Sequence, residues 1–259
     1  MDIFTFDMAG LAGFLLTLVR VSCIVFLMPF YGGEYIPIQV KAAFCLILTM
    51  AIWPHLALPG SALPAHPIGI ALLLLGELIL GLLLGLCVYF IFTGIQTGGE
   101  IMGFQMGFTM MTLADPMSGT QVSVTSHLLY MVTFLIFLSL DGHLHLLRAL
   151  ADSFVLIPPG GLRVADSLAE NVLELSAGMF ILAVKVAAPV IASLFMAELT
   201  LALMGRAAPQ MNLLTMGFPI KIAVGFFFIG VLFSTLALRM EDIIIGLKPM
   251  FDHVMMMAR

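Results

Sequence analysis

The feature that most constrains this chain is a series of apolar runs long enough to cross a lipid bilayer. The run from Ile68 to Ile95 holds a single charged residue and exceeds the roughly 20 residues that one helical crossing needs. Only 10% of the 259 residues are charged, against roughly 25% in soluble domains. Because backbone groups inside a bilayer must be hydrogen-bonded within the segment, these runs predict an all-α integral membrane protein. Three more runs have similar length: Met8–Phe30, Leu175–Met204 and Met211–Leu238.

Several classes of function are disfavoured by what the sequence lacks. A net charge of −5 without a basic cluster argues against nucleic acid as a partner. The three cysteines lie in apolar runs and are expected to be small core residues rather than metal ligands. The sequence has no zinc-protease, nucleophile-elbow, P-loop or Rossmann motif. We therefore expect no catalytic residues, no metal and no cofactor, and an enzyme is disfavoured.

The stretch from Gly98 to Ser126 differs in composition from the apolar runs around it. Its glycines and methionines each recur every fourth residue, so on a helix each set forms a row. The glycine row (Gly99, Gly103, Gly107) would allow close approach of another backbone, and the methionine row (Met102, Met106, Met110) is deformable. Asp115-Pro116 is expected to end the helix. The residues leave two interpretations open, a gate or a packing segment.

Six charged residues lie inside otherwise apolar segments, where an isolated charge is costly. They could form an ion or proton path, or they could pair between helices or subunits. Their wide separation in sequence favours pairing. Gly81 and Gly85 add a small-xxx-small pair suited to close helix packing. The six charged residues are Arg20, Glu77, Glu100, Lys185, Glu198 and Lys221.

Two breaks divide the remaining helices. Asp141 is expected to cap a second helix after the run that ends at Leu140. The polar segment from Leu162 to Glu174 is the one plausible boundary between parts. Beyond it, the last two long runs are joined by the short connector 206–210 and are predicted to form a helical hairpin.

Taken together and in order, several segments resemble one family, the R/T-type subunits of the type III secretion export gate (the FliR family). The resemblance covers about residues 5–250 and rests on the set rather than on any single motif. The segments are Arg20 with Met28-Pro29-Phe30, Gly76–Gly85, Gly99–Phe108 with Asp115-Pro116, Leu140–His143 with Ser153-Phe154, Ala208–Asn212 and Gly217–Ile222.

The resemblance implies bent helical hairpins, with residues 1–165 like a P-type gate subunit and residues 166–259 like a Q-type hairpin. It also implies that the loop at about 104–121 plugs a pore that conducts unfolded export substrates. The implied partners are P-type and Q-type subunits (FliP, FliQ), FlhB and FlhA, and membrane lipid. The implied place is the bacterial inner membrane at the flagellar basal body. The residues assigned to the plug are Phe104, Gln105, Met106, Phe108, Met110, Met111, Asp115, Pro116 and Met117.

Two other functions stay open on the residues alone. A secondary transporter or channel for a small solute or ion would prefer an internal repeat, and none is clear. An intramembrane hydrolase would need a nucleophile and a base, which the sequence does not offer. Flagellar and injectisome export are not distinguished by the sequence.

Overall fold

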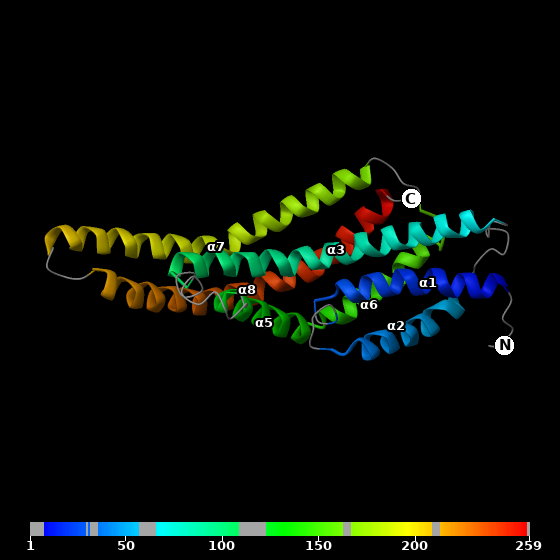
Figure 1. Cartoon of the computed structure of the whole chain (residues 1–259), viewed down its shortest axis with the longest axis horizontal. Coiled ribbons are helices and arrows are strands. Elements are labelled where there is room, and N and C mark those ends of the chain that lie inside the picture. The colour runs from blue at the N-terminus through cyan, green and yellow to red at the C-terminus, as the bar shows by residue number, and fades with distance from the viewer. Residues whose placement is uncertain are drawn as a thin grey trace. The chain divides into compact units, whose positions relative to one another are not determined.

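The computed structural model consists of helices joined by short turns in the residues that it describes (Figure 1). These residues are 8–29, 31, 36–56, 66–108, 123–162, 167–208 and 213–257. They contain no strand, so the predicted all-α class is confirmed. The elements are α1 (Met8–Leu27), α2 (Ile38–Ile52), the short 3-10 helix η1 (Trp53–His55), α3 (Pro67–Met106), α5 (Val124–Ser139), α6 (Gly142–Leu156), α7 (Ser167–Ala207) and α8 (Leu213–Met257).

Five of the described helices are long and apolar enough to cross a membrane, namely α1, α2 with η1, α3, α7 and α8. The pair α5 and α6, bent by 70°, would be a sixth if it forms one broken span. Helices α3, α7 and α8 contain 40, 41 and 45 residues. At 1.5 Å per residue each is about 60 Å long or more, roughly twice the hydrocarbon thickness of a bilayer. One crossing therefore uses only part of each helix.

The first part of the glycine- and methionine-rich stretch belongs to α3, and this helix ends earlier than the sequence predicts. Helix α3 is continuous to Met106, and Gly107 follows it with a left-handed φ of 90°. The amide of Gly107 donates to the carbonyl of Phe104 at 3.0 Å, and the amide of Phe108 donates to that of Gly103 at 3.1 Å. These two bonds form a Schellman motif, which glycine permits. The predicted helix end at Asp115-Pro116 is thus wrong, because Gly107 stops the helix first.

Two helices extend beyond the apolar runs of the sequence. Helix α8 continues through the tail to Met257, and α7 begins at Ser167 within the polar segment. In the tail, apolar residues three or four apart form one buried face, which supports the helix although the other face is charged. The amide nitrogen of Asn171 lies 2.9 Å from the Met257 sulfur, which joins the start of α7 to the end of α8. The buried residues of the tail are Met240, Ile244, Leu247, Phe251, Val254 and Met255.

The turn between α5 and α6 is made by the backbone of Asp141. This residue occupies the predicted N-cap position of α6, but its side chain makes no capping hydrogen bond. Its φ of 54° is left-handed, a conformation that aspartate tolerates better than most residues. The amides of Leu144 and His145 donate to its carbonyl oxygen, as expected at a helix start.

The chain forms two compact units, and each is assembled from separate stretches of sequence. The first comprises Met1–Tyr89, Asp141–Leu175 and Ile244–Arg259, and the second comprises Phe90–Leu140 and Ser176–Ile243. Each unit draws on both sides of residue 165. These units are therefore a different division from the P-like and Q-like parts, which remain a prediction.

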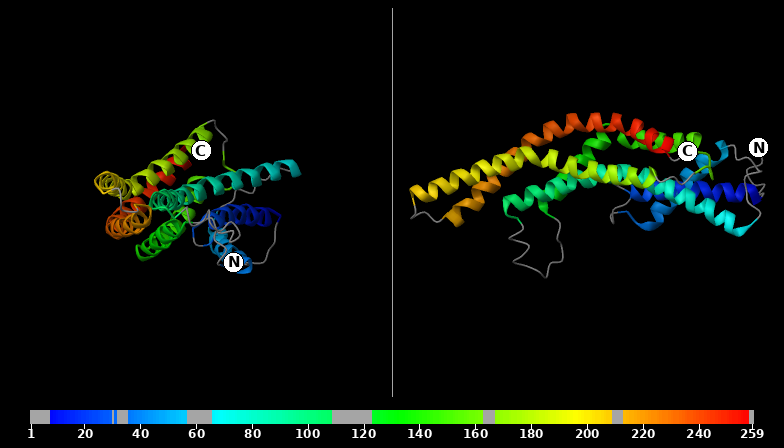
Figure 2. Two further views of the ribbon diagram at one scale, coloured as in Figure 1. Left: turned by 60° about the vertical axis from the view of Figure 1, so that its left-hand side comes forward. Right: turned by 90° about the horizontal axis from the view of Figure 1, so that it is seen from above.

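Within the second unit, α7 and α8 lie side by side and run in opposite directions. Figures 1 and 2 both show this for the yellow part of α7 and the orange part of α8. The ion pair between Glu198 and Lys221 joins the two helices directly. This arrangement is the helical hairpin that the two long apolar runs predict.

Candidate functional site

Helices α3 and α5 touch backbone to backbone on either side of residues 109–122. A Cβ at Gly99 would lie 2.6 Å from the Cα of Ser126, so only glycine fits there. One turn later Gly103 lies against the hydroxyl groups of Ser123 and Thr125, which hydrogen-bond to each other at 2.6 Å. The contact brings the two chain ends that flank 109–122 to one place. We call Gly99, Gly103, Ser123, Thr125 and Ser126 the loop root.

The loop root is also fixed against α8 by the residues that end α3. Met106 is fully buried, and its Cε lies 2.6 Å from the position of a Cβ on Gly225. Gly107 faces the ring of Phe218, and the rings of Phe108 and Phe226 meet edge to face with centroids 6.1 Å apart. The end of α3 is therefore packed tightly, except at Phe104.

Phe104 is the exposed apolar residue of this end of α3. Its side chain is 69% exposed, although its neighbours on α3 are half-buried or buried. Gln105, the next residue, donates from Nε2 to Oε2 of Glu198 at 3.4 Å, which links α3 to α7. Of the residues predicted to form a plug, Phe104, Gln105, Met106 and Phe108 thus adjoin the loop root. The other five, Met110, Met111, Asp115, Pro116 and Met117, lie outside the described residues.

The six predicted intramembrane charges fall into two pairs and two separate residues. Arg20 pairs with Glu77, and Lys221 pairs with Glu198. Glu100 is exposed, and its Oε1 lies 3.5 Å from the hydroxyl of Ser126, which also donates to the Gln96 carbonyl at 3.1 Å. Lys185 lines a pocket between α7 and α8. No continuous chain of acids connects these groups in the described part of the protein.

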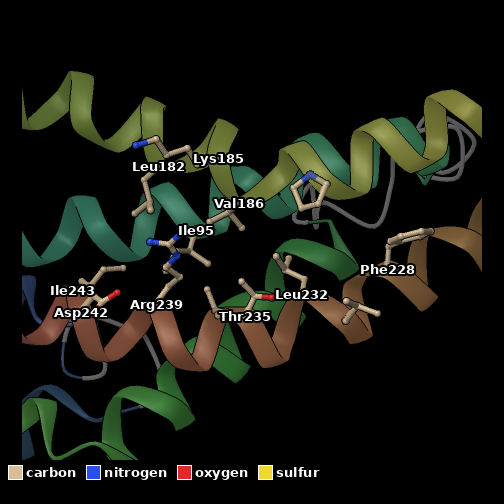
Figure 3. A pocket seen from close by; sticks show the side chains of 13 residues that line it. Ile95, Leu182, Lys185, Val186, Phe228, Leu232, Thr235, Arg239, Asp242 and Ile243 are labelled. Carbon is tan, nitrogen blue, oxygen red and sulfur yellow. The ribbon is translucent and has the colours of Figure 1, made fainter.

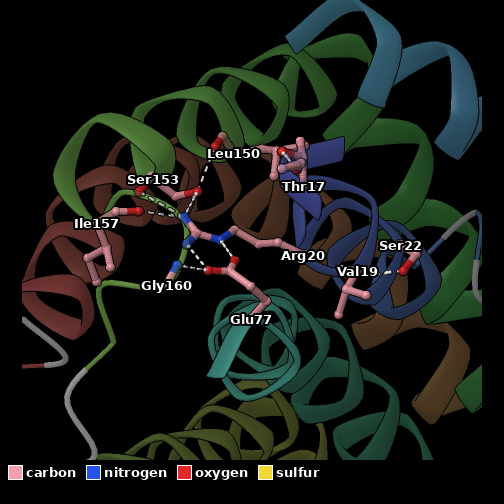
Figure 4. A network of polar contacts seen from close by, with 10 residues as sticks. Thr17, Val19, Arg20, Ser22, Glu77, Leu150, Ser153, Ile157 and Gly160 are labelled. Carbon is pink, nitrogen blue, oxygen red and sulfur yellow. Dashed lines mark hydrogen bonds and ion pairs between the residues drawn. The ribbon is translucent and has the colours of Figure 1, made fainter. Parts of the chain in front are cut away.

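Arg20 and Glu77 form a fully buried, bidentate ion pair in the first unit (Figure 4). Arg20 Nε lies 2.6 Å from Glu77 Oε2, and Nη2 lies 3.0 Å from Oε1. Arg20 Nη1 donates to the carbonyls of Ser153 and Ile157 at 3.0 and 2.9 Å. The amide of Gly160 donates to Glu77 Oε1 at 2.8 Å. The pair thus joins α1, α3, the C-terminus of α6 and the turn that follows it.

The surroundings of this pair explain how it can be buried. The Arg20 guanidinium lies 4.4 Å from the centre of the Phe154 ring, and it faces the negative end of α6, whose last carbonyls need donors. Gly81 allows the close approach of α3 to α1, because a Cβ there would lie 3.0 Å from the Arg20 carbonyl oxygen. One turn later, a Cβ at Gly85 would lie 2.6 Å from the side chain of Leu27 on α1. Glu77, Gly81 and Gly85 thus share one face of α3, which faces α1.

No group of three or more His, Cys, Asp or Glu side chains in the described residues could hold a metal ion. The chemistry that these residues offer is helix packing and charge pairing. The sequence pattern of the family described as "Bacterial export proteins, family 1" matches residues 11–246, which is most of the chain. The chain belongs to this family.

Curated relatives of this family 1 export protein carry the name flagellar biosynthetic protein FliR. The relative from Escherichia coli (strain K12) is 30% identical over 85% of this chain and 84% of its own length. The relative from Pectobacterium carotovorum is 30% identical over 83% of this chain and 81% of its own length. That from Bacillus subtilis (strain 168) is 30% identical over 89% of both. The resemblance to the FliR family is confirmed, and it points to a structural membrane component of flagellar export rather than an enzyme.

Sequence reasoning missed several residues of this family 1 export protein that hold the site together. Ser153 and Ile157 act through backbone carbonyls, which no sequence pattern reveals. Gly94 and Gly98 lie against the carbonyls of Met179 and Ala183 on α7. A Cβ added to either glycine would lie 2.9 Å from the facing carbonyl oxygen. These two glycines are four residues apart, like Gly81 and Gly85, so their spacing could have indicated the contact.

Proposed function

We propose that this protein is the R-type subunit of the flagellar type III export gate. In this role it closes a helical pore built with P-type and Q-type subunits (FliP and FliQ), next to FlhB and FlhA. Residues 1–165 would occupy a P-like position and residues 166–259 a Q-like position. The place of action is the inner membrane at the flagellar basal body, and the cargo is unfolded flagellar protein.

We further propose that residues 104–121 are the plug that closes the pore at rest. The observation that carries this proposal is the loop root. Gly99 and Gly103 lie directly against Ser126, Ser123 and Thr125, so the chain that leaves α3 returns to the same place. The two ends of this proposed plug are therefore held at one place. Its residues include a high share of methionine, whose side chain adapts to surfaces of different shape.

The charged residues support assembly in two ways. The pair Glu198–Lys221, together with Gln105, joins the Q-like hairpin to the end of α3 and so to the loop root. Glu100 is exposed beside the root and forms no ion pair in the described residues. We propose that Glu100 contacts a cation of a neighbouring subunit.

The plug proposal predicts leakage when the loop is shortened. Deleting Phe108 to Ser118 removes most of the apolar side chains of the loop, and we expect cells with the assembled gate to leak a small solute several-fold faster than wild type. The measurement is efflux of a small dye or uptake of a toxic solute. The matched control shortens residues 57–65, which precede α3 in the sequence, and should leave leakage unchanged. Wild-type leakage from a gate that still assembles with the deletion would contradict the plug assignment.

A further inference from the structure

The second unit contains a pocket that the proposed gate function does not use. Its volume is about 680 Å³, and it opens between α7 and α8 beside Ile95 of α3. Ligand sites of this size are usually apolar with a few polar groups that fix orientation. The residues that line it are Ile95, Leu182, Lys185, Val186, Pro189, Phe228, Val231, Leu232, Thr235, Leu236, Arg239, Asp242 and Ile243.

The lining is polarised along the two helices. Figure 3 shows Lys185 of α7 with Arg239 and Asp242 of α8 toward one end, and Phe228 toward the other. Because α7 and α8 are antiparallel, Pro189 and Phe228 both lie farther from the charged end. The pocket therefore combines a charged end and an apolar end, as an amphiphilic ligand does.

The two cations of the pocket are free to bind an anion. Neither Lys185 nor Arg239 makes an ion pair or a hydrogen bond through its side chain within the described residues, and both are exposed. With Asp242 the three side chains carry one net positive charge. Lysine supplies a point charge and arginine a planar fork, and both are common ligands of phosphate oxygens.

The spacing of charged residues along α7 is compatible with a headgroup position for the charged end. Lys185 and Arg206 are 21 residues apart on α7, which corresponds to about 30 Å of helix and to the hydrocarbon thickness of a bilayer. Between them the one charged residue is Glu198, which is paired with Lys221. Lys185 and its neighbour across the pocket, Arg239, can therefore lie at the boundary between hydrocarbon and headgroups.

We infer that this pocket binds an acidic phospholipid. The phosphate of the lipid lies between Lys185 and Arg239, and an acyl chain lies along Val186, Leu232 and Phe228 toward the apolar end. One net positive charge complements the single negative charge of phosphatidylglycerol. A zwitterionic lipid lacks this complementarity, and an apolar helix from another protein would leave both cations without a partner. The inference is independent of the plug and of the subunits that surround it.

The test compares lipid retention in purified full-length protein, together with whatever subunits accompany it. The protein is exchanged into nanodiscs with equal amounts of phosphatidylglycerol and phosphatidylcholine, released into mild detergent, and its bound lipids are counted by native mass spectrometry. We expect phosphatidylglycerol to be enriched on the wild type. Lys185→Gln and Arg239→Gln should each lower the enrichment about fivefold, since each removes roughly 1 kcal/mol of attraction. Lys185→Arg should keep it.

Two controls separate this effect from damage to the fold. Lys248→Gln removes an exposed cation of α8 outside the pocket and should leave lipid retention unchanged. Asp242→Asn removes the one acid of the pocket and should raise retention of phosphatidylglycerol, which a misfolded variant could not do. Equal enrichment in the double variant Lys185→Gln/Arg239→Gln and in Lys248→Gln would overturn the proposal. Equal binding of the two lipids by the wild type, or a protein segment cross-linked at this pocket in place of lipid, would overturn it as well.

Discussion

Glu77→Ala is expected to destabilise the protein by about 3–5 kcal/mol, because it leaves the Arg20 guanidinium buried without its counter-charge. Both side chains are almost fully inaccessible, at 1% and 0% exposure, so water cannot replace the lost carboxylate. The amide of Gly160 also loses its acceptor. The measurement is the thermal midpoint of the full-length protein in detergent, followed by intrinsic fluorescence or by protease resistance.

A matched variant and a double variant show whether this effect belongs to the buried pair. Glu174→Ala removes an exposed acid of α7 and should change stability by no more than about 0.5 kcal/mol. Arg20→Met/Glu77→Leu removes both charges and should be more stable than Glu77→Ala alone, since no buried charge remains unpaired. A midpoint for Glu77→Ala equal to that of Glu174→Ala would show that the pair does not hold the helices of the first unit together.

Gly99→Ala is expected to separate α3 from α5 at the loop root and to cost about 1–3 kcal/mol or more. The new methyl group would lie 2.6 Å from the Cα of Ser126, and a backbone atom cannot move aside as a side chain can. Flagellar motility should fall with stability, because the ends of the proposed plug would no longer be held together. The thermal midpoint and swimming of complemented cells measure the two effects.

The control for this variant is a glycine of the same unit that has open space around it. A Cβ at Gly178 of α7 would meet no atom within 4 Å. Gly178→Ala should therefore be neutral or stabilise by up to about 1 kcal/mol, because alanine favours helix over glycine. If the two alanine variants behave alike, the backbone contact at Gly99 has no energetic importance.

The sequence predicts the elements of this protein better than it predicts their contacts. Apolar length revealed the membrane helices, and four-residue spacing placed Gly81 and Gly85 on one packed face. The same reasoning stated that Glu77 needs a partner. It could not identify Arg20 as that partner, because 57 positions separate the two residues and only the folded arrangement of α1 and α3 brings them together.

The error at the end of α3 has a local physical cause. Gly107 follows Gly99 and Gly103 at a spacing of four residues, and this pattern predicts that it packs as part of a helix. Glycine is also the residue that ends helices in a left-handed conformation, and here that role prevails. The tail beyond Leu238 is mildly amphipathic in sequence, and in the structure its apolar residues form a buried face with helical spacing.

The most direct measurement for the proposed gate role is mass spectrometry of the complex that forms around the tagged full-length protein in a gentle detergent. We expect P-type and Q-type export subunits to co-purify with it, and expect Glu77→Ala to reduce their recovery while Glu174→Ala does not. Recovery of the folded protein alone, together with solute transport by the pure protein in liposomes, would contradict the gate role and favour a transporter or channel.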